Sequence, residues 1–194
     1  MIIKTAEPFF FPGSKTGCLL IHGFTGSPKE MSWMGEYLAE QGFSVLGLRL
    51  TGHATKPEEM IRTRYVDWMH SVEDGYHLLK GVADRVVLIG LSMGGVLSLL
   101  MASKLKVAGV IAMSAPYELT DPRIQFAKIA SETIKFLPKG DDEPGSGWFD
   151  KDAWREQVSY PENPVRSIAE LDALMAEMRA ALPTLNVPTL LVHS

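Results

Sequence analysis

The chain of 194 residues has little of what defines several protein classes. Its single cysteine, Cys18, cannot form an internal disulfide, and no Cys/His spacing typical of a metal site is present. Because no run of about 18 apolar residues occurs, we expect neither a transmembrane helix nor stable membrane insertion. The 19 Lys and Arg are outnumbered by 23 Asp and Glu, and the resulting net charge of −4 disfavours nucleic acid as a partner.

The first residues also lack the features of a secretory signal. Lys4 and Glu7 precede an aromatic patch that is interrupted by prolines, where a signal would have an aliphatic core. Since the cysteine content gives no indication of an oxidising compartment, we expect a cytoplasmic protein. Hydrophobic residues at 46% and charged residues at 22% are ordinary for a globular domain, and the length suits one domain.

Short apolar runs alternate with longer helical patterns. Runs typical of buried strands cover residues 18–21, 44–50, 85–91, 107–115 and 189–194. Helical patterns lie between them, over about 28–41, 64–81 and 93–104. This order predicts an α/β fold with a mostly parallel sheet flanked by helices. The aromatic residues near 8–11 suggest a small antiparallel edge.

The segment from Tyr117 to Pro188 is longer than one crossover requires. It holds two helical patterns, about 122–137 and 164–182, separated by a stretch rich in Gly, Pro and acidic residues. It is either a long decorated loop or a helical cap over the carboxyl ends of the strands, where open α/β sheets bind ligands. We favour the cap, since structureless loops of this length are rare. The predicted division is a core over 1–116, a cap over 117–187 and a return to the core sheet over 188–194.

The pattern G-x-S-x-G occurs as Gly90-Leu91-Ser92-Met93-Gly94, between a buried strand and a helix. A serine on such a sharp turn projects above the sheet, and the two glycines avoid collisions that a Cβ would cause. The helix that begins at Met93 offers a free backbone N–H to an oxyanion. This context favours Ser92 as a nucleophile over a glycine-rich turn without chemistry.

A second motif, His22-Gly23-Phe24-Thr25-Gly26, also follows an apolar strand. Its glycine-rich loop can bring a second backbone N–H to the nucleophile and complete an oxyanion hole. We expect His22 to order this loop by hydrogen bonds and not to act as the general base.

Together the motifs resemble the α/β-hydrolase superfamily, and in particular the small bacterial carboxylesterases and monoacylglycerol lipases. The resemblance is carried by PFFF, CLLIHGFTGSP, the Gly52-His53 loop, YVDWMHSVEDGYHLLK, VVLIGLSMGGVLSLL, GVIAMSAP and VPTLLVHS. It implies a serine carboxylic ester hydrolase with Ser92 as nucleophile and the backbone N–H groups of Phe24 and Met93 as oxyanion donors. The implied substrates are small-molecule esters of short to medium acyl chains, including monoacylglycerols, with no cofactor and no metal.

The sequence departs from this family in its triad. The family order is Ser, then an acid after the strand that here ends at Ser194, then His after the following strand. The candidates inside the chain do not occupy these places: His22, His53, His70, His77, His193, Asp121, Asp141 and Asp142. We therefore expect a longer esterase whose acid and histidine lie beyond residue 194 in a missing C-terminal fragment, so that this chain alone is inactive or strongly impaired. The alternative is a non-catalytic hydrolase relative that binds a ligand.

Other enzyme classes share parts of this pattern. Thioesterases, acyltransferases and haloperoxidases have the same serine turn, and here the cap and the PFFF start favour an esterase through the resemblance alone. A dehalogenase is disfavoured because it needs Asp in place of Ser92. A nucleotide-binding protein is disfavoured because neither glycine-rich phosphate motif occurs.

Overall fold

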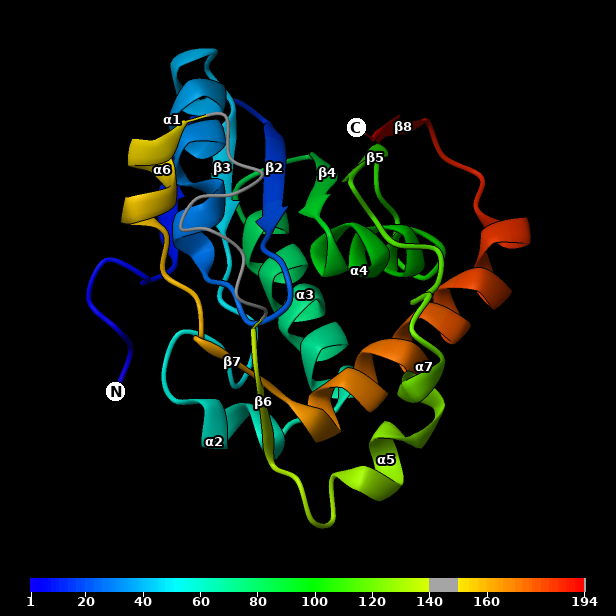
Figure 1. The fold of residues 1–194 in the computed structure, drawn as a ribbon. Coiled ribbons are helices and arrows are strands. Elements are labelled where there is room, and N and C mark those ends of the chain that lie inside the picture. Colours follow the sequence, from blue (N-terminus) through cyan, green and yellow to red (C-terminus); the bar gives the residue numbers. More distant parts are fainter. Residues whose placement is uncertain (140–149, 194) are drawn as a thin grey trace.

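The computed structural model describes residues 1–139 and 150–193, with a six-stranded sheet at its centre (Figure 1). The strand order is β1-β3-β2-β4-β5-β8; β1 is antiparallel to β3, and all other neighbours are parallel. The strands are β1 (Phe9–Phe11), β2 (Thr16–Ile21), β3 (Ser44–Gly47), β4 (Arg85–Leu91), β5 (Gly109–Met113) and β8 (Thr189–Val192). The α/β fold with its small antiparallel edge is therefore confirmed.

The remaining elements are helices and a second, two-stranded sheet. The helices are η1 (Pro28–Met31), α1 (Ser32–Glu40), α2 (Pro57–Ile61), α3 (Tyr65–Lys80), α4 (Met93–Ala102), η2 (Pro122–Phe126), α5 (Ala127–Ala130), α6 (Lys151–Glu156), α7 (Val165–Ala181) and η3 (Leu182–Thr184). The small antiparallel sheet pairs β6 (Phe136–Pro138) with β7 (Glu162–Pro164). None of these helices has the length and apolar character needed to span a bilayer.

Strand β2 is buried on both faces, which explains its nearly continuous apolar sequence. Leu19 and Ile21 point into a large core cluster shared with α3, α4 and α7. Cys18 and Leu20 point to the opposite face, into a smaller cluster that includes Met31 and is packed against α1. The strand that precedes the His22 motif is thus held from both sides, and its carboxyl end is a rigid support for the loop that follows.

Two predicted elements differ clearly from the structure, and the loop after one of them holds a helix that was not predicted. Residues 122–137 form η2 and α5 and then turn into β6, where the prediction was one helical pattern. The β-branched and aromatic residues at 133–136 favour a strand, and Pro138 suits a short edge strand. The strand predicted over 44–50 ends at Gly47, and the loop that follows contains the unpredicted helix α2, which begins with Pro57.

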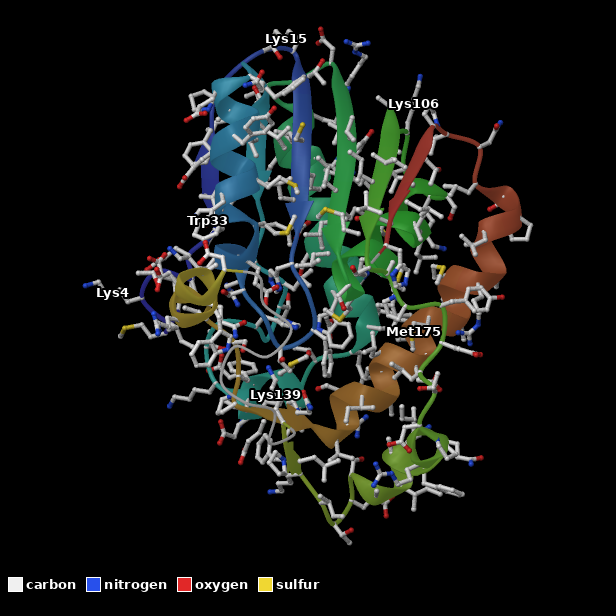
Figure 2. All side chains as sticks on the ribbon, turned by 45° about the horizontal axis from the view of Figure 1, so that its top comes forward. Lys4, Lys15, Trp33, Lys106, Lys139 and Met175 are labelled. Carbon is white, nitrogen blue, oxygen red and sulfur yellow. The ribbon has the colours of Figure 1, made fainter. Side chains whose placement is uncertain are left out.

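The segment between β5 and β8 lies at the carboxyl ends of the central strands. In Figure 1, α5, β6, β7 and much of α7 lie beyond the arrowhead of β2. Figure 2 gives the same arrangement: Lys15 and Lys106, which precede β2 and β5, mark one end of the sheet, and Lys139 and Met175 lie toward the other. Residues 140–149 of the stretch rich in Gly, Pro and acidic residues, with Asp141 and Asp142, lie outside the described residues.

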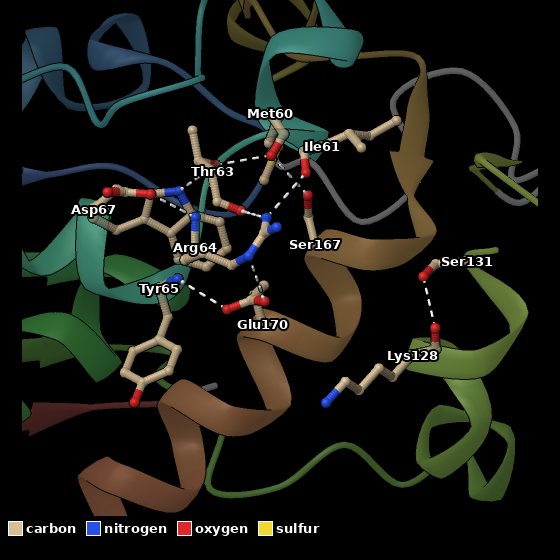
Figure 3. A network of polar contacts seen from close by, with 11 residues as sticks. Met60, Ile61, Thr63, Arg64, Tyr65, Asp67, Lys128, Ser131, Ser167 and Glu170 are labelled. Atoms are coloured by element: carbon tan, nitrogen blue, oxygen red, sulfur yellow. Dashed lines mark hydrogen bonds and ion pairs between the residues drawn. The ribbon is translucent and has the colours of Figure 1, made fainter.

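Helix α7 is joined to the α2–α3 connection by a polar network (Figure 3). Glu170 on α7 accepts a hydrogen bond from the Tyr65 backbone N–H at 3.2 Å and lies 3.5 Å from the Arg64 guanidinium. The Ser167 hydroxyl donates to the Met60 carbonyl oxygen at 3.2 Å. These contacts fix the segment between β5 and β8 on the core, over the carboxyl ends of the strands.

Candidate active site

Ser92 is the single residue between β4 and α4, and its backbone has a positive φ. Its φ of 54° and ψ of −118° are unfavourable for a residue with a side chain. The surrounding structure holds it there: the Ser92 N–H donates to the Met113 carbonyl oxygen at 2.8 Å, and the N–H groups of Gly95 and Val96 donate to the Ser92 carbonyl oxygen. Residues held in such conformations cluster at active sites.

The glycines around Ser92 are required by close backbone packing. A Cβ on Gly90 would lie 2.0 Å from the Gly94 carbonyl oxygen, and a Cβ on Gly94 would lie 2.1 Å from the Ile21 carbonyl oxygen. The α4 helix can therefore start directly against β4 and β2 only with glycine at both positions. The prediction that these glycines avoid collisions is confirmed.

The loop after β2 lies beside Ser92. A Cβ on Gly23 would be 3.6 Å from the Ser92 Cβ and 3.6 Å from the Leu91 carbonyl oxygen. Phe24 follows at once, and Met93 opens α4, so both expected oxyanion donors come from backbone adjoining Ser92. Within residues 1–139 and 150–193, no acceptor is assigned to the N–H of Phe24 or Met93, which leaves both available to a ligand oxygen.

His22 orders this loop, as predicted. One ring nitrogen, Nδ1, must donate, because its partner at 3.0 Å is the Gly23 carbonyl oxygen; the other, Nε2, accepts from the Leu50 N–H at 3.2 Å. The Gly23 carbonyl also receives the Gly26 N–H at 3.2 Å. Burial lowers the pKa of His22 to about 4, so the ring is neutral near pH 7. Both nitrogens are engaged, which leaves His22 no free nitrogen to act as a base.

Glu30 supports the same loop from η1, a contact that sequence reasoning missed. Its Oε2 accepts the Gly23 N–H at 3.0 Å, and its Oε1 is so close to Gly26 that a Cβ there would lie 2.1 Å away. Burial raises the pKa of Glu30 to about 7, against the opposing effects of the Gly23 N–H and Lys139. The sequence signal, Ser27-x-x-Glu30, is that of a helix capping box and gives no hint of the contact with Gly23.

The positions of the other histidines give no reason to assign any of them as the general base. His53 is fully buried, its Nδ1 donates to the Thr51 carbonyl oxygen at 3.2 Å, and burial with His22 nearby holds its pKa well below the ordinary value. In the described part of the chain, neither His22 nor His53 is hydrogen-bonded to Ser92. His70 and His77 are exposed on α3, and His193 is exposed after β8. Asp121 caps η2 and pairs with Arg123 at 2.6 Å.

The segment between β5 and β8 contains an open, largely apolar hollow of about 560 Å³. Its walls come from η2, α5, β6, β7 and the start of α7. Ile124, Ile134, Leu137, Val165 and Ile168 line it together with the polar side chains of Asp121, Arg123 and Asn163. A concave apolar surface of this size suits a hydrocarbon chain. Across the residues that the structure covers, no group of three or more His, Cys, Asp or Glu could hold a metal ion.

Comparisons with known proteins agree on one family. The model described as "Alpha/beta hydrolase family" matches residues 18–194. The chain is 35% identical over its whole length to the thermostable monoacylglycerol lipase of Bacillus sp. (strain H-257), covering 75% of that protein. It is 28% identical to the carboxylesterase of Bacillus subtilis (strain 168), covering all of this chain and 77% of that one.

Solved structures give the same result. A structure from the metagenome-derived lipolytic enzymes LipS and LipT superposes with a TM-score of 0.89 at 31% identity, covering all of this chain and 77% of that one. The monoacylglycerol lipase of Paleococcus ferrophilus superposes with a TM-score of 0.77 at 19% identity, covering 96% of this chain and 76% of that one. The second likeness supports the fold alone.

Proposed function

The chain belongs to the α/β-hydrolase family, and on that premise we propose that it is a serine carboxylesterase acting through an acyl-enzyme on Ser92. The observation that carries the proposal is the strained φ of 54° at Ser92, held directly beside the Gly23–Phe24 loop. The proposed substrates are esters of short- to medium-chain carboxylic acids, including monoacylglycerols. The lipase and esterase relatives support this substrate class.

The proposed reaction begins with attack of the Ser92 Oγ on the ester carbonyl carbon. The negative charge that develops on the carbonyl oxygen is stabilised by the N–H groups of Phe24 and Met93. The general base takes the proton of the Ser92 hydroxyl and passes it to the alcohol as the ester C–O bond breaks. Water then attacks the acyl-serine: its oxygen joins the acyl group to form the acid, and one of its protons returns to Ser92 Oγ. In the order nucleophile, acid, histidine, the acid follows the β8 strand and the histidine follows a further strand. We assign the base to none of His22, His53, His70, His77 and His193.

We also propose which residues form the core and which form the cap. Residues 1–116 and 188–194 supply the hydrolase core, and residues 117–187 form a cap. The apolar hollow in the cap would take the acyl chain of the substrate, since burial of each methylene contributes about 0.8 kcal/mol.

Covalent labelling tests the nucleophile. A fluorophosphonate probe should modify Ser92 in the complete protein, and mass spectrometry of the digested protein should locate the adduct there; Ser92→Ala should abolish it. Ser114→Ala is the matched control, because Ser114 also follows a strand and also has a positive φ, 46°. Equal labelling of wild type and Ser92→Ala would overturn the assignment.

Turnover gives the second test. We propose that the 194-residue chain alone hydrolyses p-nitrophenyl butyrate only weakly, because His22 and His53 are neutral, buried and not bonded to Ser92. An incomplete triad leaves roughly 10³–10⁴-fold acceleration over water. Fast turnover that disappears in Ser92→Ala would show that another group acts as the base. Tight acyl-ligand binding with no labelling of Ser92 would instead favour a binding protein.

A further inference from the structure

Tyr160 lies just before β7, in the proposed cap, and is only 3% exposed. Its hydroxyl donates to the Gly52 carbonyl oxygen at 2.7 Å and accepts the Thr55 N–H at 2.9 Å. Its backbone N–H donates to the Thr25 carbonyl oxygen at 2.9 Å. One residue of the cap is thus bonded to two separate loops of the core.

The first of these loops carries Phe24. The carbonyl group before Phe24, that of Gly23, is held by the His22 ring, and the carbonyl group after it, that of Thr25, is held by Tyr160. Thr25 is 1% exposed and has a positive φ of 58°. This backbone conformation is unfavourable for a threonine, so it persists only while neighbouring contacts hold it.

The second loop connects back to the first through two aromatic rings. His53 lies between Gly52 and Thr55, and its ring meets the His22 ring with centroids 5.0 Å apart. Tyr160 therefore contacts the Phe24 loop in two ways. Its backbone N–H binds Thr25 directly, and its hydroxyl holds the 52–55 loop, whose His53 packs against His22, which in turn binds Gly23. Loss of the Tyr160 hydroxyl removes only the second, indirect connection.

We infer that Tyr160 is a positioning residue that ties the cap to the loop of Phe24 and so keeps the Phe24 N–H aimed at the oxyanion. The inference rests on the proposed function, in that it takes Phe24 as an oxyanion donor. Burial raises the pKa of the Tyr160 phenol, so the hydroxyl stays protonated and keeps donating to Gly52 throughout the neutral range. The cap thereby helps to organise the oxyanion hole as well as covering the site.

The experiment compares Tyr160→Phe with wild type. The variant keeps the ring and the backbone N–H and removes only the hydroxyl. Tyr117→Phe is the matched control, because Tyr117 belongs to the same cap segment and is 61% exposed. Two quantities are measured: deuterium uptake by peptides covering residues 22–31, 50–56 and 85–91, and the kinetics of Ser92 modification by a fluorophosphonate, separated into KI and kinact.

In Tyr160→Phe we expect faster uptake over 50–56 and 22–31 and unchanged uptake over 85–91. We expect kinact to fall roughly fivefold to tenfold, the effect of one neutral hydrogen bond, with KI unchanged, because the oxyanion donor acts mainly in the transition state. Tyr117→Phe should match wild type. A purely structural role would raise uptake at 85–91 as well or leave kinact unchanged, and either result overturns the inference.

Failure of the proposed function would be visible separately. If the probe modifies neither the complete wild-type protein nor its Ser92→Ala variant, Ser92 is not the nucleophile, and the uptake data alone decide about Tyr160. Faster uptake restricted to the two loops would then still support the tether, and uptake equal to that of Tyr117→Phe would refute it.

Discussion

The rings of His22 and His53 meet edge to face with their centroids 5.0 Å apart, and both side chains are fully buried. Protonation of either ring would place an unsolvated cation beside a second imidazole. The pKa of His22 is lowered to about 4 and that of His53 also lies well below 6.5, in both cases mainly because of burial. The pair that orders the Phe24 loop is therefore neutral in the working protein.

This pair should make the fold sensitive to acid. In the unfolded chain both histidines take up protons near pH 6.5, and in the folded chain only at lower pH, so their stabilising contribution is present above 6.5 and is lost as the pH falls toward 4. For His22 alone the loss is on the order of 3 kcal/mol. The loss of stability can be measured from the midpoints of urea unfolding at pH 7.5, 6 and 5. His70→Gln, at an exposed position, should leave the pH dependence intact.

Glu30 should give stability the opposite pH dependence from that of the two histidines. Its carboxyl ionises near 4.5 when unfolded and near 7 when folded, so its contribution to stability is largest below pH 4.5 and declines as the pH rises to 7. Glu30→Gln keeps an acceptor for the Gly23 N–H and removes the charge, so at pH 8 it should be more stable than wild type by up to about 3 kcal/mol. It should also lose stability more steeply on acidification, since the histidines then act unopposed. Glu36→Gln, at an exposed position on α1, should match wild type at each pH.

Gly94→Ala should damage both fold and site. The new methyl group would lie 2.1 Å from the Ile21 carbonyl oxygen, so the start of α4 must move away from β2. We expect a loss of about 1–3 kcal/mol in the free energy of unfolding and a large drop in Ser92 labelling. Gly81→Ala is the control, since Gly81 is exposed, has a φ of −65° and follows α3. A Gly94→Ala protein with native labelling would contradict the close packing described.

Glu170→Ala should loosen the attachment of the segment between β5 and β8 to the core. It removes the acceptor of the Tyr65 N–H and the partner of Arg64 together, which we expect to cost about 1–2 kcal/mol. Limited proteolysis should show faster cleavage within residues 117–187 than in wild type, with the core fragment remaining intact. Glu177→Ala, at an exposed position on the same helix, provides the comparison.

The core strands and the Ser92 turn could be predicted because their signals are local. Each buried strand is a short apolar run, and the glycines around Ser92 are two residues away on either side. The β6 strand was missed because a helical spacing of apolar residues continued through 122–137, while Pro138 and the β-branched residues before it set the structure. The α2 helix was missed because five residues starting at Pro57 are too few to show a period.

The supports of the site could not be predicted in this way. Tyr160 and Gly52 are 108 residues apart in the chain, and nothing near either residue indicates the other. Glu30 is seven residues from Gly23, yet its position three residues after Ser27 is typical of a helix cap. The sequence therefore indicates a candidate nucleophile and candidate oxyanion donors, whose roles stay a prediction, whereas the contacts that hold them depend on the assembled fold.

The backbone strain at Ser92 also makes this serine a reporter of the folded state. Its positive φ is maintained only while β4 is paired with β5 and α4 is formed; a chain that opens there relaxes to ordinary dihedral angles. The reactivity of this one hydroxyl should therefore follow the native fraction of the purified protein through a denaturant titration, so that the extent of covalent labelling measures how much of the protein is folded.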